Sequence, residues 1–332
     1  MSRPKLKVAV LCGGRSGEHE VSLRSAQAIL DHLNPEFYEP RRIFISKSGQ
    51  WDPAPILPEP GANPGIDVVF PVLHGTFGED GAVQGLLELA NLPYVGAGVF
   101  ASAASMDKEH FKRLCLRDNL PVTEYEVLHT GNPHIPHPLE PAIARFGFPL
   151  FVKPANLGSS VGISKAHDHA ELEAAVALAA RYDVKVLIER AISGQEIECS
   201  VIGNYRPQAA TPCEILPSRE WYDYEDKYLL GAARALLPAN LTQAETEEIR
   251  RLSVACFRAV ECMGMARVDF FIERPSGKIY INEINTIPGF TSISMYPKMW
   301  EHAGLPFHQL VEMLIDLALE RHHLRQSLRY ER

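Results

Sequence analysis

The sequence predicts an α/β protein of three domains: a parallel α/β domain, a small central α+β domain, and a C-terminal α+β domain with a mainly antiparallel sheet. The chain has 332 residues, which is long for one hydrophobic core. In roughly its first hundred residues, apolar strand candidates alternate with helical patterns, as is typical of a parallel sheet. From Asp107 onward this alternation changes, and some predicted strands follow one another directly.

The predicted N-terminal domain covers residues 1–104. Its expected elements, in chain order, are the strand Lys5–Cys12, the helix Ser22–Leu33, the strand Asp67–Leu73, the helix Ala82–Ala90 and the short strand Pro93–Val95. The first strand ends at a tight Gly-Gly turn, and the Asp67–Leu73 strand ends in a polar loop. Ligands of open α/β sheets bind at such carboxyl ends.

The predicted central domain covers residues 105–190. Its expected elements are the helix Lys108–Asp118, the strand Glu124–Leu128, the helix Leu139–Phe146, the strand Pro149–Lys153, the Gly/Ser turn Asn156–Gly162, the strand Val161–Lys165, the helix Asp168–Arg181 and the strand Lys185–Glu189.

The predicted C-terminal domain covers residues 191–332. Its expected elements are the strands Glu196–Ile202 and Arg206–Pro212, an irregular stretch over 217–239, the helix Thr242–Met263, the strands Ala266–Glu273 and Lys278–Glu283, a loop, and the final helix Phe307–Arg321. The irregular stretch is either a solvated loop or a lid over a reacting site, because long loops in compact domains are often functional.

Composition narrows the possible partners. The net charge is −8, whereas proteins that neutralise a phosphate backbone usually carry the opposite balance, so we expect no nucleic acid. No apolar run approaches the ~20 residues that span a bilayer, and no signal peptide is visible. The six cysteines form no CxxC pair. These features favour a cytoplasmic protein with no membrane partner.

Two predicted neighbouring strands carry the strongest chemical signal. Strand residues alternate faces, so Arg267 and Asp269 share one face, and Glu283 and Asn285 share a face of the next strand. If the strands pair, these four groups converge. Carboxylate and amide oxygens suit Mg²⁺. The alternative is a salt-bridge ladder on the surface of an antiparallel pair.

A second signal begins at Lys153 and continues into the glycine- and serine-rich turn Gly158–Gly162. A lysine and the backbone N–H groups of such a turn can hold phosphate, although a plain hairpin explains the glycines equally well. The turn Gly13–Glu18 lacks the GxGxxG spacing, which argues against an NAD-dependent dehydrogenase.

In chain order these motifs resemble those of the D-alanine–D-alanine ligases of the ATP-grasp superfamily, over nearly the whole chain. The resemblance is carried by GGRSGEHEVSLRSA (Gly13–Ala26), LHGTFGEDGAVQG (Leu73–Gly85), SMDK (Ser105–Lys108), VKPANLGSSVGISK (Val152–Lys165), DYEDKY (Asp223–Tyr228), ARVDFF (Ala266–Phe271) and INEINTIPGFTSISMYP (Ile281–Pro297). It implies a three-domain ATP-grasp fold with a Rossmann-like first domain, and ATP-dependent synthesis of D-alanyl-D-alanine for peptidoglycan through a D-alanyl phosphate.

The resemblance also implies how ATP is held. Lys108 and Lys153 would contact the α- and β-phosphates, and Lys227 the γ-phosphate. Glu189 would meet the adenine amino group and Glu196 the ribose hydroxyls. The other residues expected at the nucleotide are Ser159, Ser160 and Ile192.

Metal and substrate residues follow from the same resemblance. The expected ligands of two Mg²⁺ or Mn²⁺ ions are Asp269, Glu283 and Asn285, with Glu283 bridging. Glu18 would pair with the ammonium of the first D-alanine and form a hydrogen-bonded triad with Ser159 and Tyr228. Arg267 and the Gly289 N–H would form an oxyanion hole. The remaining substrate contacts would be His74, Ser294 and Met295.

Two alternatives remain beside the dipeptide ligase. A related ligase would make D-alanyl-D-lactate or D-alanyl-D-serine; Tyr228 favours the dipeptide, because depsipeptide formers alter this position. A catalytically inactive ATP-grasp sensor is the second alternative, and the intact set of Arg267, Asp269, Glu283 and Asn285 argues against it. The family also suggests a homodimer.

Overall fold

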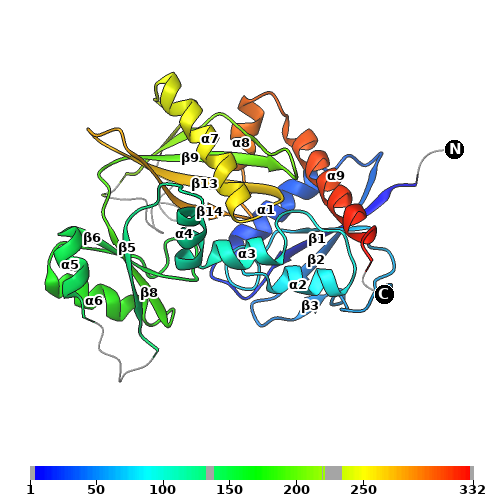
Figure 1. The fold of residues 1–332 in the computed structure, drawn as a ribbon. Helices are drawn as coiled ribbons and strands as arrows, with labels where there is room; N and C mark the ends of the chain where they lie inside the picture. Colours follow the sequence, from blue (N-terminus) through cyan, green and yellow to red (C-terminus); the bar gives the residue numbers. More distant parts are fainter. Residues whose placement is uncertain (1–3, 132–137, 219, 221–233, 330–332) are drawn as a thin grey trace.

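Three β-sheets organise the protein in the computed structural model, which describes residues 4–131, 138–218, 220 and 234–329 (Figure 1). The first sheet lies at one end of the molecule and the second at the other, while the third lies between and above them in this view. None of the helices in the described ranges combines the length and apolar character needed to cross a membrane.

The first sheet has the order β3-β2-β1-β4. Its strands are β1 (Leu6–Gly13), β2 (Tyr38–Ile45), β3 (Trp51–Asp52) and β4 (Val68–Pro71), and its helices are α1 (His19–His32), α2 (Ala82–Leu89) and α3 (Val99–Met106). β1 pairs in parallel with β2 and β4, which agrees with the parallel sheet expected for this region. Gly13 ends β1 with φ +90°, where a Cβ would lie 2.2 Å from the Ile45 carbonyl oxygen. Only glycine therefore fits this turn, which leads to α1.

Several elements of this region differ from the prediction. The expected strand Pro93–Val95 is reduced to an isolated bridge between Tyr94 and Val69. β2, β3 and α3 were not predicted; β2 reads YEPRRIFI, and its proline and charged residues hide the strand pattern. α1 begins at His19, three residues before the predicted Ser22.

The second sheet is antiparallel throughout, in the order β5-β8-β6-β7. Its strands are β5 (Tyr125–His129), β6 (Leu150–Pro154), β7 (Ser164–Ala166) and β8 (Lys185–Arg190), and the helices α5 (Glu140–Phe146) and α6 (His169–Ala179) share its hydrophobic core. β7 starts at Ser164, so the predicted strand Val161–Lys165 began too early. Helix α4 (Lys108–Arg117) leads into this unit and packs against the core of the third sheet.

The third sheet has the antiparallel order β12-β11-β9-β13-β14, with β10 beside β9. Its elements are β9 (Gly194–Gly203), β10 (Gln208–Ala209), β11 (Cys213–Leu216), β12 (Arg234–Leu236), α7 (Gln243–Ala259), β13 (Gly264–Glu273), β14 (Ile279–Asn285), α8 (Met295–His302) and α9 (Phe307–Gln326). β12 falls in a stretch that we expected to be irregular, and β11 and α8 were not predicted. A capping box between Thr242 and Glu245 starts α7 at the predicted place.

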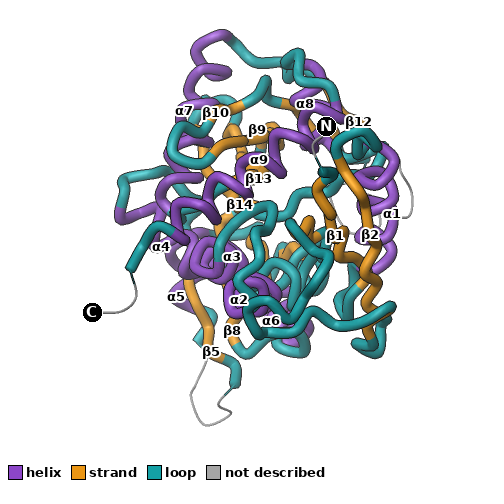
Figure 2. Tube along the Cα trace, turned by 90° about the vertical axis from the view of Figure 1, so that its right-hand side faces the viewer, coloured by secondary structure: helices purple, strands orange, loops and turns teal. Residues whose placement is uncertain are grey.

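One hydrophobic core joins the first and third sheets. Val8 and Phe70 of the first sheet belong to the same buried cluster as Tyr296 of α8 and Leu314 of α9. In both views β1 and β2 lie together at a distance from the pair β5 and β8 (Figure 2). The second sheet has its own hydrophobic core and meets the rest of the molecule along a boundary between cores. The site described next lies at this boundary.

Candidate active site

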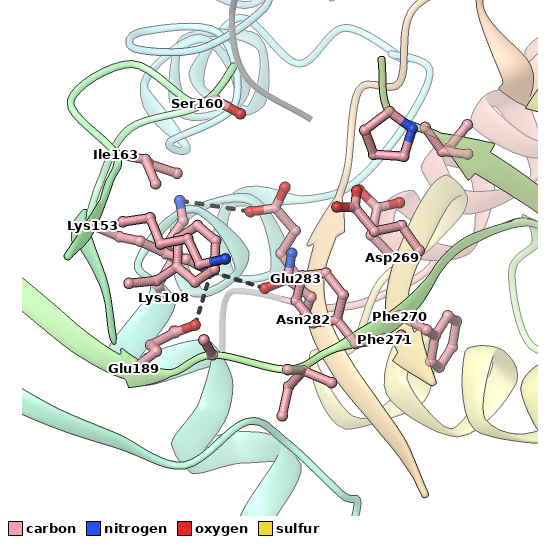
Figure 3. A pocket seen from close by; sticks show the side chains of 18 of the residues that line it. Lys108, Lys153, Ser160, Ile163, Glu189, Asp269, Phe270, Phe271, Asn282 and Glu283 are labelled. Atoms are coloured by element: carbon pink, nitrogen blue, oxygen red, sulfur yellow. Dashed lines mark hydrogen bonds and ion pairs between the residues drawn. The ribbon is translucent and has the colours of Figure 1, made fainter. Parts of the chain in front are cut away.

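A cavity of about 400 Å³ lies between the second and third sheets. Charged groups and apolar side chains both line it (Figure 3). Seven of the residues predicted to hold a nucleotide line this cavity: Lys108, Lys153, Ser159, Ser160, Glu189, Ile192 and Glu196. The eighth, Lys227, lies outside the described residues. The apolar part of the wall includes Phe151, Ile163 and Phe270.

Two buried lysines line this cavity, one at the start of α4 and one on β6 (Figure 3). Lys153 Nζ lies 2.8 Å from Glu189 Oε2 and donates to Asn282 Oδ1 at 3.0 Å. Lys108 Nζ lies 3.7 Å from Glu283 Oε2 and donates to the Leu157 carbonyl at 2.6 Å. Two ammonium groups thus face carboxylates in a confined space, an arrangement suited to a polyanion.

Glu189 on β8 is 1% exposed and stands between two lysines. Lys112 Nζ is 3.1 Å from its Oε1, opposite Lys153. Burial alone would raise the pKa of Glu189, but the charges of Lys112 and Lys153 outweigh it and lower that pKa to about 2. Lys112 was not predicted as a site residue. Its position four residues after Lys108, on the same face of α4, is the sequence signal that could have identified it.

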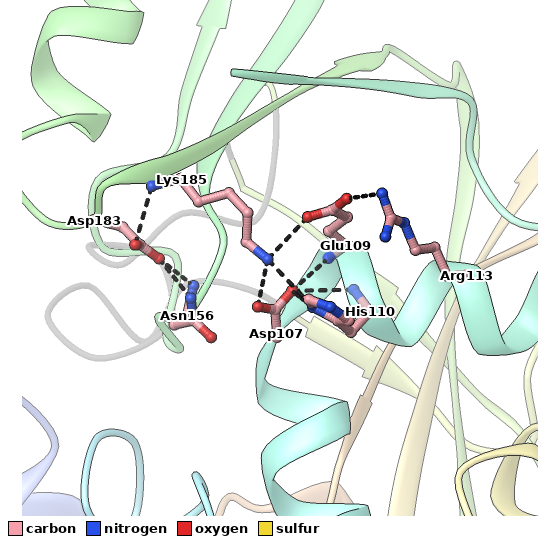
Figure 4. Close-up of polar contacts among 7 residues, drawn as sticks. All are labelled: Asp107, Glu109, His110, Arg113, Asn156, Asp183 and Lys185. Atoms are coloured by element: carbon pink, nitrogen blue, oxygen red, sulfur yellow. Dashed lines mark hydrogen bonds and ion pairs between the residues drawn. The ribbon is translucent and has the colours of Figure 1, made fainter. Parts of the chain in front are cut away.

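A polar cluster fixes the start of α4, which carries Lys108 (Figure 4). The Asp107 carboxylate caps the helix by accepting from the N–H groups of Glu109 at 3.1 Å and His110 at 3.0 Å. Lys185 Nζ of β8 lies 2.5 Å from Asp107 Oδ2 and 2.9 Å from Glu109 Oε2. The Lys185 ammonium thus lies between the carboxylates of Asp107 and Glu109.

The predicted acidic patch forms on β13 and β14. Their antiparallel register places Asp269 opposite Glu283 and Arg267 opposite Asn285. The Arg267 guanidinium donates to both carboxylate oxygens of Asp269, at 2.7 Å each, and the Asn285 amide donates to Asp269 Oδ2 at 3.0 Å. These two strands do pair, which was the condition for the four side chains to converge.

Arg267 is permanently charged in this environment. Burial would lower its pKa, but the carboxylates of Asp269 and Glu198 raise it well above the usual value. Its Nε is 3.4 Å from Glu198 Oε1.

The donor set of the patch fits a divalent cation. Glu283 lines both this cavity and a smaller neighbouring one, while Asp269 lines the larger and Asn285 the smaller. Carboxylate and amide oxygens in one patch beside a polyanion site match the preference of Mg²⁺. The carboxylates of the patch already form ion pairs, Asp269 with Arg267 and Glu283 with Lys108. A bound cation would therefore have to displace part of these pairs.

A second cavity of about 130 Å³ adjoins the first. The two share four lining residues: Gly158, Ser159, Glu198 and Glu283. All six residues predicted to hold the amino-acid substrates line the smaller cavity: Glu18, His74, Arg267, Gly289, Ser294 and Met295. The structure thus brings the two predicted groups of residues to adjoining cavities.

Ser159 connects the cavities to the first sheet. Its hydroxyl donates to the Glu18 carboxylate, which stands at the N-cap of α1. Ser159 and Ser160 have φ of 53° and 59°, a left-handed conformation that non-glycine residues adopt rarely. Asp183 anchors the start of this loop by accepting from the backbone and side-chain N–H groups of Asn156, at 2.7 and 2.9 Å (Figure 4). Tyr228, the third member of the predicted triad, lies outside the described residues.

The loop after β4 brings a histidine and an unpredicted glutamate to the smaller cavity. His74 is buried, and both ring nitrogens have protein partners: the Ile287 carbonyl at 3.0 Å and Ser25 Oγ at 3.3 Å. Glu79 accepts from the N–H groups of Gly75 at 2.6 Å and Ile287 at 3.3 Å. Burial raises the pKa of Glu79 to about 8, and the nearby charge of Glu18 adds to this shift. Its place in the loop HGTFGEDG, after a buried strand, was the available signal.

Known proteins match this chain over nearly all its length. Family models described as D-ala D-ala ligase N-terminus and D-ala D-ala ligase C-terminus match residues 7–97 and 114–316. A D-alanine–D-alanine ligase from Solibacter usitatus (strain Ellin6076) is 64% identical over 328 residues, which cover 99% of this chain and 100% of the relative.

Solved structures agree with the sequence matches. The D-alanine-D-alanine ligase from Coxiella burnetii is 39% identical with a TM-score of 0.86, covering 97% of this chain and 96% of that one. The VanG D-Ala:D-Ser ligase from Enterococcus faecalis is 35% identical, also with a TM-score of 0.86, covering 95% of this chain and 100% of that one. The fold, the two adjoining cavities and these matches together establish that the chain belongs to the D-alanine–D-alanine ligase family, a family of ATP-dependent ligases with the ATP-grasp fold.

Proposed function

We propose that this protein joins two D-alanine molecules into D-alanyl-D-alanine, with ATP as the phosphoryl donor, for peptidoglycan precursor synthesis. The observation that carries the proposal is the meeting of the two cavities at Glu283 and Ser159. The larger cavity presents lysines suited to phosphates, and the smaller presents a partly buried arginine beside carboxylates. A phosphoryl group leaving the first cavity would therefore be adjacent to a carboxylate held in the second.

In the larger cavity, Lys108 and Lys153 would hold the α- and β-phosphates, with the Ser159–Ser160 turn beside them, and Lys227 would reach the γ-phosphate. Glu189 would accept from the adenine amino group, since the neighbouring lysines keep it ionised, and Glu196 would meet the ribose. Ile192 offers an apolar contact for the base.

In the smaller cavity, Glu18 would pair with the ammonium of the first D-alanine. Arg267 and the Gly289 N–H would face the oxygen that becomes an oxyanion. Ser294 and Met295 stand at the start of α8 and would contact the second D-alanine. Tyr228 would complete the triad with Glu18 and Ser159.

Two chemical steps follow from these roles. A carboxylate is a poor electrophile, so an oxygen of the first D-alanine attacks the γ-phosphorus; ADP leaves, and D-alanyl phosphate forms. The lysines offset the charge of the transferring group. The amine of the second D-alanine then attacks the acyl carbon, a tetrahedral oxyanion forms, and its collapse releases phosphate and a proton. Arg267 would stabilise this oxyanion in a confined space.

Asp269, Glu283 and Asn285 would hold two Mg²⁺ or Mn²⁺ ions, with Glu283 between them. When bound, such ions offset negative charge on the phosphates. The chain's own cations, Arg267 and Lys108, already lie beside these carboxylates.

The second substrate separates this proposal from its nearest alternative. The similarity to a D-Ala:D-Ser ligase makes D-serine a relevant competitor; D-lactate is the other. Mass spectrometry of the products from ATP with D-alanine, tested against L-alanine, D-serine and D-lactate, decides between them. D-alanyl-D-alanine as the main product supports the proposal. A lack of D-alanine-dependent phosphate release would favour the sensor instead.

We further propose a cytoplasmic homodimer with domains at residues 1–104, 105–190 and 191–332. We also propose a lid over 217–239, most of which lies outside the described residues. The acidic composition argues against nucleic acid as a partner. Sedimentation equilibrium of the full chain tests the dimer.

A further inference from the structure

Three polar groups of the first sheet's region hold the loop between β14 and α8, which we define as the 286–294 loop. This loop carries Gly289 and Ser294, two of the residues that line the smaller cavity. Its ends are fixed by regular structure, since β14 ends at Asn285 and α8 begins at Met295. Gly289 is confined further, because a Cβ there would lie 2.6 Å from Ser294 Oγ.

The first two contacts act on one residue, Ile287. Its N–H donates to Glu79 Oε1 at 3.3 Å, and its carbonyl lies 3.0 Å from His74 Nδ1. Both partners belong to the loop after β4, more than 200 positions earlier in the chain. Ile287 is 2% exposed, so these contacts are shielded from water. The N–H and carbonyl groups of Ile287 are thus both held by side chains of the loop after β4.

The third contact comes from Ser25 on α1. The Phe290 N–H donates to Ser25 Oγ at 3.1 Å, and His74 Nε2 lies 3.3 Å from the same oxygen. Ser25 is fully buried. Phe290 is anchored on its other side by edge-to-face ring contacts with Phe70 and Phe307. Gly289 therefore lies in a short stretch whose flanking peptides are held by Glu79, His74 and Ser25.

The chemistry of these groups fixes the direction of each hydrogen bond. A carbonyl only accepts, so His74 Nδ1 must carry the proton that it donates to Ile287. In the neutral ring Nε2 is then an acceptor, and the Ser25 hydroxyl donates to it. The Ser25 oxygen keeps lone pairs to accept from Phe290 N–H. One chain of donors and acceptors thus runs from α1 through His74 to the 286–294 loop.

From this network we infer that Ser25 is a positioning residue for the ligation step, acting through His74 and the Phe290 peptide to hold the Gly289 N–H against the smaller cavity. Glu79 supports the same loop from the Ile287 peptide. The inference rests on the proposed role of Gly289 as an oxyanion donor. It assigns Ser25 no contact with substrate. Displacement of an oxyanion donor by an ångström is expected to cost far more in kcat than in ATP affinity.

The test uses Ser25→Ala in the full-length protein, with Ser102→Ala as the matched control. Ser102 is also fully buried in a helix of the same region, and its hydroxyl has no hydrogen-bond partner among the described residues. We expect Ser25→Ala to lower kcat about 10- to 100-fold with the KM for ATP within about twofold of wild type. Hydrogen–deuterium exchange should speed up in peptides covering 286–294 and remain unchanged in α7. The control should match wild type in all three readouts.

Unchanged exchange at 286–294 in Ser25→Ala overturns the inference, and so does faster exchange with unchanged kcat. Glu79→Gln provides a second variant if Ser25→Ala does not fold. The two carboxyl oxygens of Glu79 contact the N–H groups of Gly75 and Ile287 separately, whereas a glutamine amide has only one oxygen that can accept. Faster exchange at 286–294 with a lower kcat is expected there as well, and wild-type values overturn the inference.

Arg267→Met separates the proposed function from this inference: it removes an oxyanion contact without touching the 286–294 contacts. If Arg267→Met loses activity while Ser25→Ala keeps the kcat and the exchange rates of wild type, the result contradicts the role inferred for Ser25 but not the proposed function.

Discussion

The Ser159 hydroxyl donates a hydrogen bond to the Glu18 carboxylate across 141 positions of sequence. This contact links the loop after β6 to the start of α1, and both residues line the smaller cavity. A carboxylate at a helix N-terminus is stabilised by the helix dipole, and it is also a ready partner for an ammonium group.

Replacement of Glu18 by glutamine should weaken binding of the first D-alanine. Removal of a charge-assisted partner corresponds to about a 10- to 100-fold rise in the KM for D-alanine, with little change in the KM for ATP. Initial rates at varied D-alanine measure this. Glu20→Gln is the matched control, because Glu20 lies two residues on, is exposed, and pairs with Lys47 at 2.9 Å. Equal KM values for D-alanine in both variants would contradict a contact between Glu18 and the substrate.

Replacement of Arg267 by methionine should lower kcat by about 10²–10³-fold, the usual loss for one oxyanion donor. The partly buried guanidinium also donates to both carboxylate oxygens of Asp269, so some stability should be lost too. Steady-state kinetics and urea unfolding measure the two effects separately. Arg274→Met serves as control, since Arg274 follows the same strand and bonds to Gln195 and Glu245. Retention of more than a tenth of kcat in Arg267→Met would contradict the proposed role.

Replacement of Glu283 by glutamine should raise the Mg²⁺ concentration needed for half-maximal rate by about tenfold or more, because one charged ligand becomes neutral. Excess chelator should stop turnover of the wild type, and added Mg²⁺ or Mn²⁺ should restore it. Glu273→Gln is the control at the far end of β13, where the carboxylate pairs with Arg190 at 2.7 Å. A Mg²⁺ requirement that is the same in both variants would place the metal elsewhere.

The ion cluster around Glu189 should make stability depend on pH. Its folded pKa of about 2 lies below the ordinary value of 4.5. The stabilisation is therefore present above pH 4.5 and is lost as the pH falls toward 2. Urea unfolding should show wild type more stable than Glu189→Gln, with the difference narrowing by roughly 2 kcal/mol between pH 5 and pH 3. Glu36→Gln, at an exposed turn position, should show no such narrowing. If the difference in the free energy of unfolding between wild type and Glu189→Gln did not change with pH, the lysines would not be stabilising the ionised form of Glu189.

Tyr228→Phe should allow D-lactate to serve as second substrate. The prediction rests on the family resemblance, in which depsipeptide formers alter this position. Incubation with ATP, D-alanine and D-lactate, followed by mass spectrometry, should show D-alanyl-D-lactate for the variant and only dipeptide for the wild type. Absence of the depsipeptide from the variant would reject this role for Tyr228.

The acidic patch was predictable because it depends on two local regularities. Side chains alternate along a strand, so Arg267 and Asp269 had to share a face. Both strands carry apolar residues between these positions, which favours pairing of the two strands over a common core. Lys153 was predictable for a similar reason, since it stands near the end of a recognisable strand. Lys108 was identified only through the family resemblance.

The groups that were missed depend on tertiary contacts. Lys112 becomes part of the site only because β8 places Glu189 beside α4. Glu79 and Ser25 act on Ile287 and Phe290, which lie more than 200 positions away. A local pattern can indicate that Lys112 or Glu79 lies near the site, but it does not reveal the contact that each residue makes. The missed elements have a different cause: β12 is three residues long, and β2 carries a proline and two arginines.

The core shared by the first and third sheets has a mechanical consequence. Because Val8 and Phe70 pack in one cluster with Tyr296 and Leu314, these parts should move as a single block. The second sheet packs around a core of its own, so we expect it to tilt as a rigid unit relative to that block. The larger cavity lies at the boundary between them, whereas most of the wall of the smaller one belongs to the block. We therefore expect nucleotide exchange to require tilting of the second sheet, while the smaller cavity keeps its shape through each turnover.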